Sequence, residues 1–127
     1  MNRRIRASFI VALSVLSALS IQPALSHHSF SMFDRTKEVA LAGTVKTFEW
    51  TNPHSWLQLV VRDARGGEKE YSIELGSPNT LSRSGWRKTS FKPGDRVTVT
   101  MYPMRDGAAG GAFVSAVDAQ GRVLPIS

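Results

Sequence analysis

Three histidines are the residues in this chain best suited to chemistry, and their positions suggest what that chemistry is. His27 and His28 are adjacent and follow an apolar leader, whereas His54 lies between Trp50 and Trp56, directly after an Asn-Pro pair. Proline fixes its own φ and disfavours helical backbone before it, so Asn-Pro between two strand-like runs predicts a turn. Loops on a rigid scaffold often carry binding residues. We therefore expect His54 at the tip of a turn.

The first 26 residues have the pattern of a secretory signal peptide. Three arginines precede an apolar run over residues 7–19, and residues 24–26 (Ala-Leu-Ser) supply the small side chains that a signal peptidase accepts. The alternatives are a cut after Ser20 and an uncleaved anchor, but the run is shorter than the ~20 apolar residues of a membrane span. We expect cleavage after Ser26, a periplasmic or secreted protein, and no stable membrane span after processing.

Cleavage after Ser26 would make His27 the first residue of the mature protein. Its α-amine and its ring Nδ1 could then close a chelate ring on one metal ion. A second imidazole, from His28 or His54, would complete a nitrogen-rich set that suits Cu(II) among the divalent ions. The predicted metal ligands are therefore His27, His28 and His54, with copper as the first choice of ion.

Two other interpretations of the histidines remain open. Zinc would need a fourth donor, for which three carboxylates are candidates: Asp34, Glu49 and Asp106. The histidines could also be ordinary linker and turn residues, because they lack the spacing of a known metal motif. Methionines are soft ligands for Cu(I), so Met101 and Met104 are further candidates, although such residues more often pack a core.

Composition and charge narrow the class of protein. Lys and Arg exceed Asp and Glu by six in the 127 residues, and removing the three leader arginines lowers this excess to three. An excess of that size favours solubility and does not mark a nucleic-acid binder, which the exported address also disfavours. The chain has no cysteine, so its stability must come from packing, or from packing and a metal. Nucleophile-elbow and phosphate-loop motifs are absent too, and we expect no enzyme.

From residue 38 onward the pattern is typical of strands. Alternating or continuous apolar runs predict strands over 39–50, 55–63, 69–75, 96–102, 112–118 and 122–125, with a short helix over 77–85. Three strands, a helix and two or three more strands is the order of an OB-like β-barrel, and a β-sandwich is the alternative. The expected organisation is a signal peptide (1–26), an N-terminal arm (27–37) and an all-β barrel domain (38–127) of five to six strands.

In an OB-like barrel the first and last inter-strand loops commonly flank the ligand-binding face. We therefore expect the turn that carries His54 and the loop over 104–111 to stand at the same end. The predicted partner-binding residues are Trp50, Asn52, Trp56, Arg105 and Asp106. They define a second functional hypothesis, a metal-free module that binds an envelope protein or glycan through the first turn.

Tryptophan and basic residues suggest two weaker binding features. Three tryptophans, including Trp86, could form a stacking platform, although in a domain this small they more often fill the core. A basic cluster follows the expected helix: Arg83, Arg87, Lys88 and Lys92. It is either a solvated face or a contact for an anionic lipid or polysaccharide.

Short motifs run through nearly the whole mature chain. They are His27-His28-Ser29-Phe30, Phe33-Asp34, Gly43-Thr44-Val45, Trp50-Thr51-Asn52-Pro53-His54, Ser77-Pro78, Leu81, Gly85-Trp86, Pro93-Gly94-Asp95, Pro103 and Arg105-Asp106-Gly107. With these motifs the chain resembles a group of small exported proteobacterial proteins known only as a domain of unknown function. The resemblance implies export and the fold expected above, and it assigns no activity.

Overall fold

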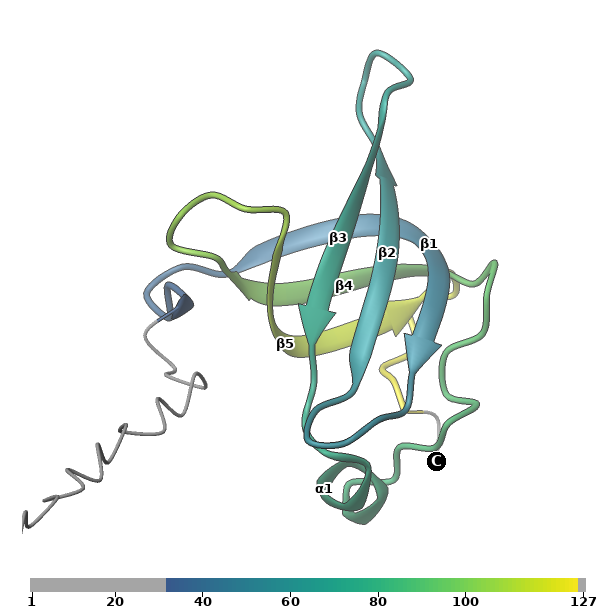
Figure 1. The fold of residues 1–127 in the computed structure, drawn as a ribbon. Coiled ribbons are helices and arrows are strands. Elements are labelled where there is room, and N and C mark those ends of the chain that lie inside the picture. Colours follow the sequence, from purple (N-terminus) through teal and green to yellow (C-terminus); the bar gives the residue numbers. More distant parts are fainter. Residues whose placement is uncertain (1–31, 126–127) are drawn as a thin grey trace, which may run out of the picture.

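The computed structural model describes residues 32–125, so the leader, His27 and His28 lie outside the described part. It contains β1 (Val39–Glu49), β2 (Trp56–Arg62), β3 (Glu68–Glu74), α1 (Pro78–Arg83), β4 (Arg96–Pro103) and β5 (Gly110–Asp118). The strands form a closed barrel in the order β1-β2-β3-β5-β4, with β1 also paired to β4 (Figure 1). Only the β3–β5 pair is parallel among these strand pairs. The structure confirms the expected OB-like barrel with one helix between the third and fourth strands, rather than a sandwich.

Strand β1 closes the barrel because it pairs with two neighbours. Its first half, from Val39 to Thr44, pairs with β4, and its second half, from Thr44 to Glu49, pairs with β2. At the change of partner the backbones approach closely, since a Cβ on Gly43 would stand 2.7 Å from the Val60 carbonyl oxygen. Glycine in a strand often marks such an approach. The register of the β1–β2 pair shifts two residues further on, between Val45 and Thr47.

The core follows from the alternation of side chains along the strands. Because successive residues point to opposite faces, one set from each strand fills the barrel. The buried members from the strands are Val45, Leu57, Leu59, Ile73, Val97, Val99, Met101 and Ala116. Trp86 and Phe91 extend this core through ring contacts, with centroids 5.2 Å apart. Met101 is 1% exposed and therefore packs inside the barrel.

Helix α1 begins and ends as its sequence indicates. The Ser77 side chain accepts a hydrogen bond from the Thr80 amide, and Pro78 occupies the first helical position. Gly85 follows the helix with a φ of +85°. Leu81 is the helix's buried residue and joins the barrel core. The helix lies next to the β1–β2 turn, at the lower end of the barrel in Figure 1.

The C-terminal part differs from the expectation. Residues 122–125 form no strand, although Val123 forms a bridge with Val117, the Leu124 amide donates to the Ala116 carbonyl, and Arg122 is bonded to Asp118 at the end of β5. Strand β5 also begins earlier than predicted, at Gly110. Across residues 32–125 no helix is both long and apolar enough to cross a membrane.

Candidate functional site

The turn between β1 and β2 is held at both of its ends. Thr51 donates a hydrogen bond from Oγ1 to the carbonyl oxygen of His54 at 2.9 Å, and the Asn52–Pro53 peptide bond is cis. The Ser55 amide donates to the carbonyl oxygen of Gly76, while the Ser55 carbonyl accepts from the Leu75 amide. These bonds fix His54 at the end of the turn, directly beside the exit of β3.

The His54 imidazole contacts a carboxylate that the sequence did not single out. Its Nδ1 atom lies 2.6 Å from Oε1 of Glu74, the last residue of β3. The two side chains are 28% and 16% exposed, respectively, so the pair is half-buried and reachable from solvent. A carboxylate beside one ring nitrogen keeps the proton on that nitrogen and aims the other, Nε2, as a ligand. This arrangement is common around metal-binding histidines.

The start of the described chain docks against the loop between β4 and β5. The Arg105 amide donates to the Met32 carbonyl, and the Asp34 amide donates to the Pro103 carbonyl. Between them Phe33 forms a bridge with Met104 and is buried. The arm is therefore docked on the barrel from Met32 onward, as expected of an N-terminal segment with apolar side chains.

One row of outward-facing residues connects this docked arm with His54. Strand register places Trp56 opposite Glu74, Glu74 opposite Ala112, and Ala112 opposite Tyr102. The Arg35 guanidinium lies over the Tyr102 ring, 5.9 Å from its centroid. The arm and the His54–Glu74 pair thus share the outer face of β3, β5 and β4.

Asp34 ends the docked arm with a tight local network. Its carboxylate accepts hydrogen bonds from the Thr36 hydroxyl at 2.6 Å and the Thr36 amide at 3.1 Å, and it pairs with Lys37 at 3.2 Å. The bonds from Thr36, followed by Lys37, lower the pKa of Asp34 to about 2. Asp34 is therefore engaged locally and does not approach His54 through these contacts.

Arg105 and Asp106 lie exposed in the β4–β5 loop, where Asp106 accepts a hydrogen bond from the Ala108 amide. Figure 1 shows this loop beside the docked arm, away from the β1–β2 turn, which lies next to α1. The expectation that these residues stand at the same end as His54 is therefore wrong. The reason is that β4 and β5 cross the direction of β2 and β3, so the loops at the ends of these two strand pairs lie on different sides of the barrel (Figure 1).

The predicted residues of the first turn itself occupy three different surroundings. Trp50 is half-buried and packs edge-on against Phe48, with ring centroids 5.7 Å apart. Trp56 is half-buried on the outward row, and Asn52 is exposed at the tip of the turn. A hollow of about 300 Å³ adjoins Trp50 and is lined by Ser82, Gly85, Trp86, Arg87 and Lys88.

Within residues 32–125 no three side chains of His, Asp or Glu gather as a metal site would require. Glu49, a candidate fourth ligand, instead accepts a long 3.5 Å hydrogen bond from Gln58. The other two predicted ligands, His27 and His28, lie outside the described residues.

Glu74 is the site residue that sequence reasoning missed. Glu74 alternates with the buried Ile73 and Leu75, and this pattern indicates only that its side chain points outward. The signal that could have found Glu74 is the register of β2 and β3 across the turn that joins them. Counting outward from Arg62 opposite Glu68 brings Trp56 opposite Glu74, two residues from His54.

The barrel and its turn define a small OB-like protein with a carboxylate-held histidine on its outer face. Residues 15–113 match the model of a family described as a family of unknown function (DUF6152), and the chain belongs to this family. No curated protein and no solved structure matches the chain.

Proposed function

We propose that this protein is an exported binding protein of the bacterial cell envelope that holds a transition metal, copper first. The ligands are the amine and ring of His27, after cleavage behind Ser26, together with His54, and His28 is the alternative second ring. Its role is to carry or buffer the metal, rather than to catalyse a reaction.

The contact between His54 and Glu74 carries this proposal. A histidine without a binding role would gain nothing as a ligand from the Glu74 carboxylate, which lies 2.6 Å from Nδ1 of His54. A ligand histidine gains from one, because the carboxylate fixes the tautomer and raises the basicity of the ligating nitrogen. Imidazole and amine nitrogens together favour Cu(II) over the harder ions.

The geometry of the arm supports a shared site. Four residues lie between His27 and Met32, so the two are five residue steps apart, and a fully extended chain spans at most about 18 Å over five steps. Neighbouring strands lie about 4.8 Å apart, so the Glu74 and Tyr102 backbones, on either side of Ala112, are roughly 10 Å apart. Arg35 of the docked arm, which lies over the Tyr102 ring, is therefore on the same face as Glu74 and two strand spacings from it.

Copper binding by protein that begins at His27 tests the proposal. Calorimetry with Cu(II) is run on this protein, on the same protein with one glycine before His27, and on His54→Gln. We expect one ion per chain, with at least tenfold weaker binding in both altered proteins, because each loses a nitrogen ligand. Equal affinity in all three would contradict the proposal. Intact-mass measurement of the exported protein fixes the true first residue.

A second candidate function is a metal-free module that binds an envelope protein or glycan through the β1–β2 turn. The observation that favours it is the hollow beside Trp50, which combines an indole with two cations, Arg87 and Lys88. Aromatic faces stack on sugars, and the cations suit an acidic polysaccharide. Tryptophan fluorescence during titration with soluble envelope polysaccharide tests it. We expect a saturable change that Lys88→Gln weakens and Lys46→Gln, on β1, leaves unchanged.

A further inference from the structure

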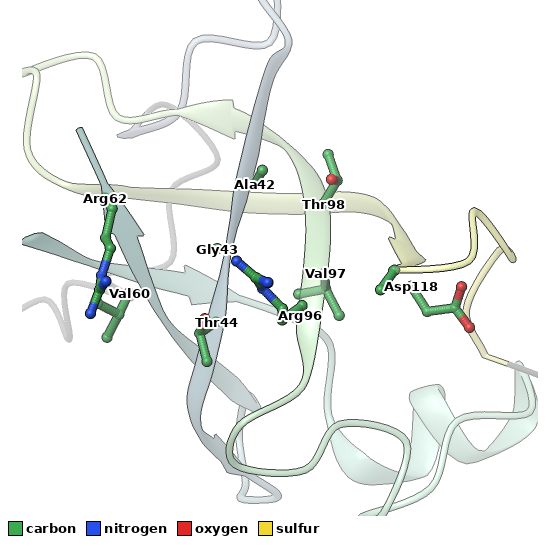
Figure 2. Close-up of a pocket in the computed structure, with 10 residues that line it drawn as sticks. Ala42, Gly43, Thr44, Val60, Arg62, Arg96, Val97, Thr98 and Asp118 are labelled. Atoms are coloured by element: carbon green, nitrogen blue, oxygen red, sulfur yellow. The ribbon is translucent and has the colours of Figure 1, made fainter. Parts of the chain in front are cut away.

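The outer face of the barrel is hollowed where β1 changes partners from β4 to β2. The hollow measures about 220 Å³ and is floored by the small outward residues Ala42 and Thr44 of β1. Val60 and Arg62 border it on β2, and Arg96 and Thr98 border it on β4. Figure 2 shows the Arg96 side chain extending over β1 near Gly43, with Arg62 on the far side of that strand.

Arg96 is the centre of this surface. Two further hollows, of about 490 and 500 Å³, adjoin the first, and Arg96 lines all three. Within residues 32–125 the Arg96 guanidinium makes neither an ion pair nor a hydrogen bond. Guanidinium groups usually pair with a carboxylate or a phosphate in a two-point contact when one is in reach.

The nearby carboxylates are already engaged elsewhere. Asp118 accepts hydrogen bonds from the Gln120 and Arg122 amides at 2.9 Å and from the Arg122 side chain at 2.7 Å, and in Figure 2 it points away from Arg96. Burial opposes ionisation of this carboxyl, but the bonds from Arg122 and Gln120 leave its pKa below the usual value. Glu68 pairs with Arg62 at 2.9 Å. Asp118 lines the hollow and Glu68 lines an adjoining one, but each is paired with another arginine, and neither forms an ion pair with Arg96.

The chain before β4 adds a positive field. Residues 83–96 carry five cations and one carboxylate, and that carboxylate, Asp95, accepts a hydrogen bond from the Lys92 amide. This segment includes Lys92 and Arg96, which line the same adjoining hollow. Basic side chains outnumber the acidic ones along these concave surfaces, and such an excess of positive charge raises the local concentration of anions.

We propose that the hollow over β1 binds a phosphate group, with the Arg96 guanidinium as its main contact. The donors come from three strands: Arg96 and the Thr98 hydroxyl from β4, the Thr44 hydroxyl from β1, and Arg62 from β2. Donors spread in this way suit a tetrahedral group with several acceptor oxygens better than a planar carboxylate with two. The group belongs either to a soluble phosphate ester or to a phospholipid headgroup.

Nitrogen-15 NMR of metal-free protein, titrated with inorganic phosphate at constant ionic strength, tests the site. We expect saturable shifts at the Thr44 and Thr98 amides and at Arg96 Nε. Arg96→Gln should raise the half-saturation concentration at least tenfold. Arg65→Gln, an exposed arginine in the turn between β2 and β3 that lines none of the three hollows, is the matched control and should leave it unchanged. The spectra also report whether each variant is folded.

Three results would overturn the proposal: no saturable shift, the same half-saturation in Arg96→Gln, or equal binding of acetate. Sedimentation with phosphatidic acid vesicles, against phosphatidylcholine vesicles, separates the two sources of phosphate. Arg96-dependent sedimentation with phosphatidic acid identifies a lipid headgroup. Phosphate binding in solution without sedimentation identifies a soluble ester. Because the titrations use metal-free protein, their results do not depend on whether the protein binds copper.

Discussion

Glu74 Oε1 and His54 Nδ1 lie 2.6 Å apart, and this contact joins the β1–β2 turn to the last residue of β3. It connects segments that are twenty residues apart in the sequence. The contact therefore acts on two properties, the orientation of the imidazole and the position of the turn.

Glu74→Gln should weaken Cu(II) binding by about 10- to 100-fold, because an amide cannot hold the imidazole and raise its basicity as a carboxylate does. Calorimetry on protein that begins at His27 measures the change. The matched control is Glu70→Gln on the same strand, since Glu70 pairs with Lys46 and not with a histidine. Similar copper affinities for E74Q and the wild type would show that Glu74 does not support a ligand.

Gly43→Ala should destabilise the barrel by about 1–3 kcal/mol, the usual cost of forcing extra atoms into a packed interior. A Cβ at this position would meet the Val60 carbonyl oxygen at 2.7 Å and Leu59 Cγ at 2.8 Å. Denaturant unfolding measures the loss. Gly76→Ala is the control, because its Cβ would come no closer than 3.7 Å to its neighbours and should cost far less.

Ser77→Ala should cost about 0.5–2 kcal/mol of folding free energy, because the Thr80 amide loses the side chain that caps it. Ser82→Ala in the same helix is the matched control. Ser82 is exposed inside the helix, where alanine is the better helix former, so this change should be neutral or slightly stabilising. Thermal unfolding of both variants measures these changes. Equal losses of stability in Ser77→Ala and Ser82→Ala would argue against a capping role for Ser77.

Ser55→Ala should leave stability unchanged or raise it. The Ser55 side chain is 0% exposed, and its Oγ has no hydrogen-bond partner among residues 32–125. A buried hydroxyl without a partner costs free energy that an alanine avoids. Denaturant unfolding tests this, and a loss above about 1 kcal/mol would mean that the hydroxyl is hydrogen-bonded, for example to a buried water.

The Asp34 network predicts acid sensitivity of the docked arm. The pKa of Asp34 is lowered to about 2, below that of an unfolded aspartate near 3.9. Its contribution to stability is therefore complete above about pH 4 and is lost as the pH falls toward 2. Denaturant unfolding at a series of pH values measures this. The difference in unfolding midpoint between the wild type and Asp34→Asn should shrink as the pH falls from about 4 to 2. Asp106→Asn, in the β4–β5 loop, serves as the control, and a constant difference for D34N would contradict the assignment.

The sequence predicted the elements well where alternation and turn chemistry agree. The strands over 55–63 and 69–75 and the helix over 77–85 could be predicted because their signals come from neighbours in the chain. Strand β5 was placed two residues too late, because Gly110 and Gly111 look like loop residues. Their lack of a side chain is what lets β5 lie against the Ser72 and Tyr102 carbonyls, and that closeness is a tertiary property.

The candidate site was predictable only in part. His54 was correctly placed in a turn between two strands, since the proline signal is local. Predicting the role of Glu74 requires the register between β2 and β3. Predicting the role of Arg96 requires knowing that Glu68 and Asp118 pair with other arginines. The separation of Arg105 from His54 depended on how the strands cross the barrel, which periodicity along the chain does not encode.

Strand β5 lies between β3 and β4 although it follows both of them in the sequence. The parallel contacts of residues 72–74 with 110–112 therefore cannot form before β5 is available. Until then the sheet has an open seam between β3 and β4, and the core lacks Ala116. Closure of the barrel is consequently a later event than the pairing of β1 with β2 and of β2 with β3.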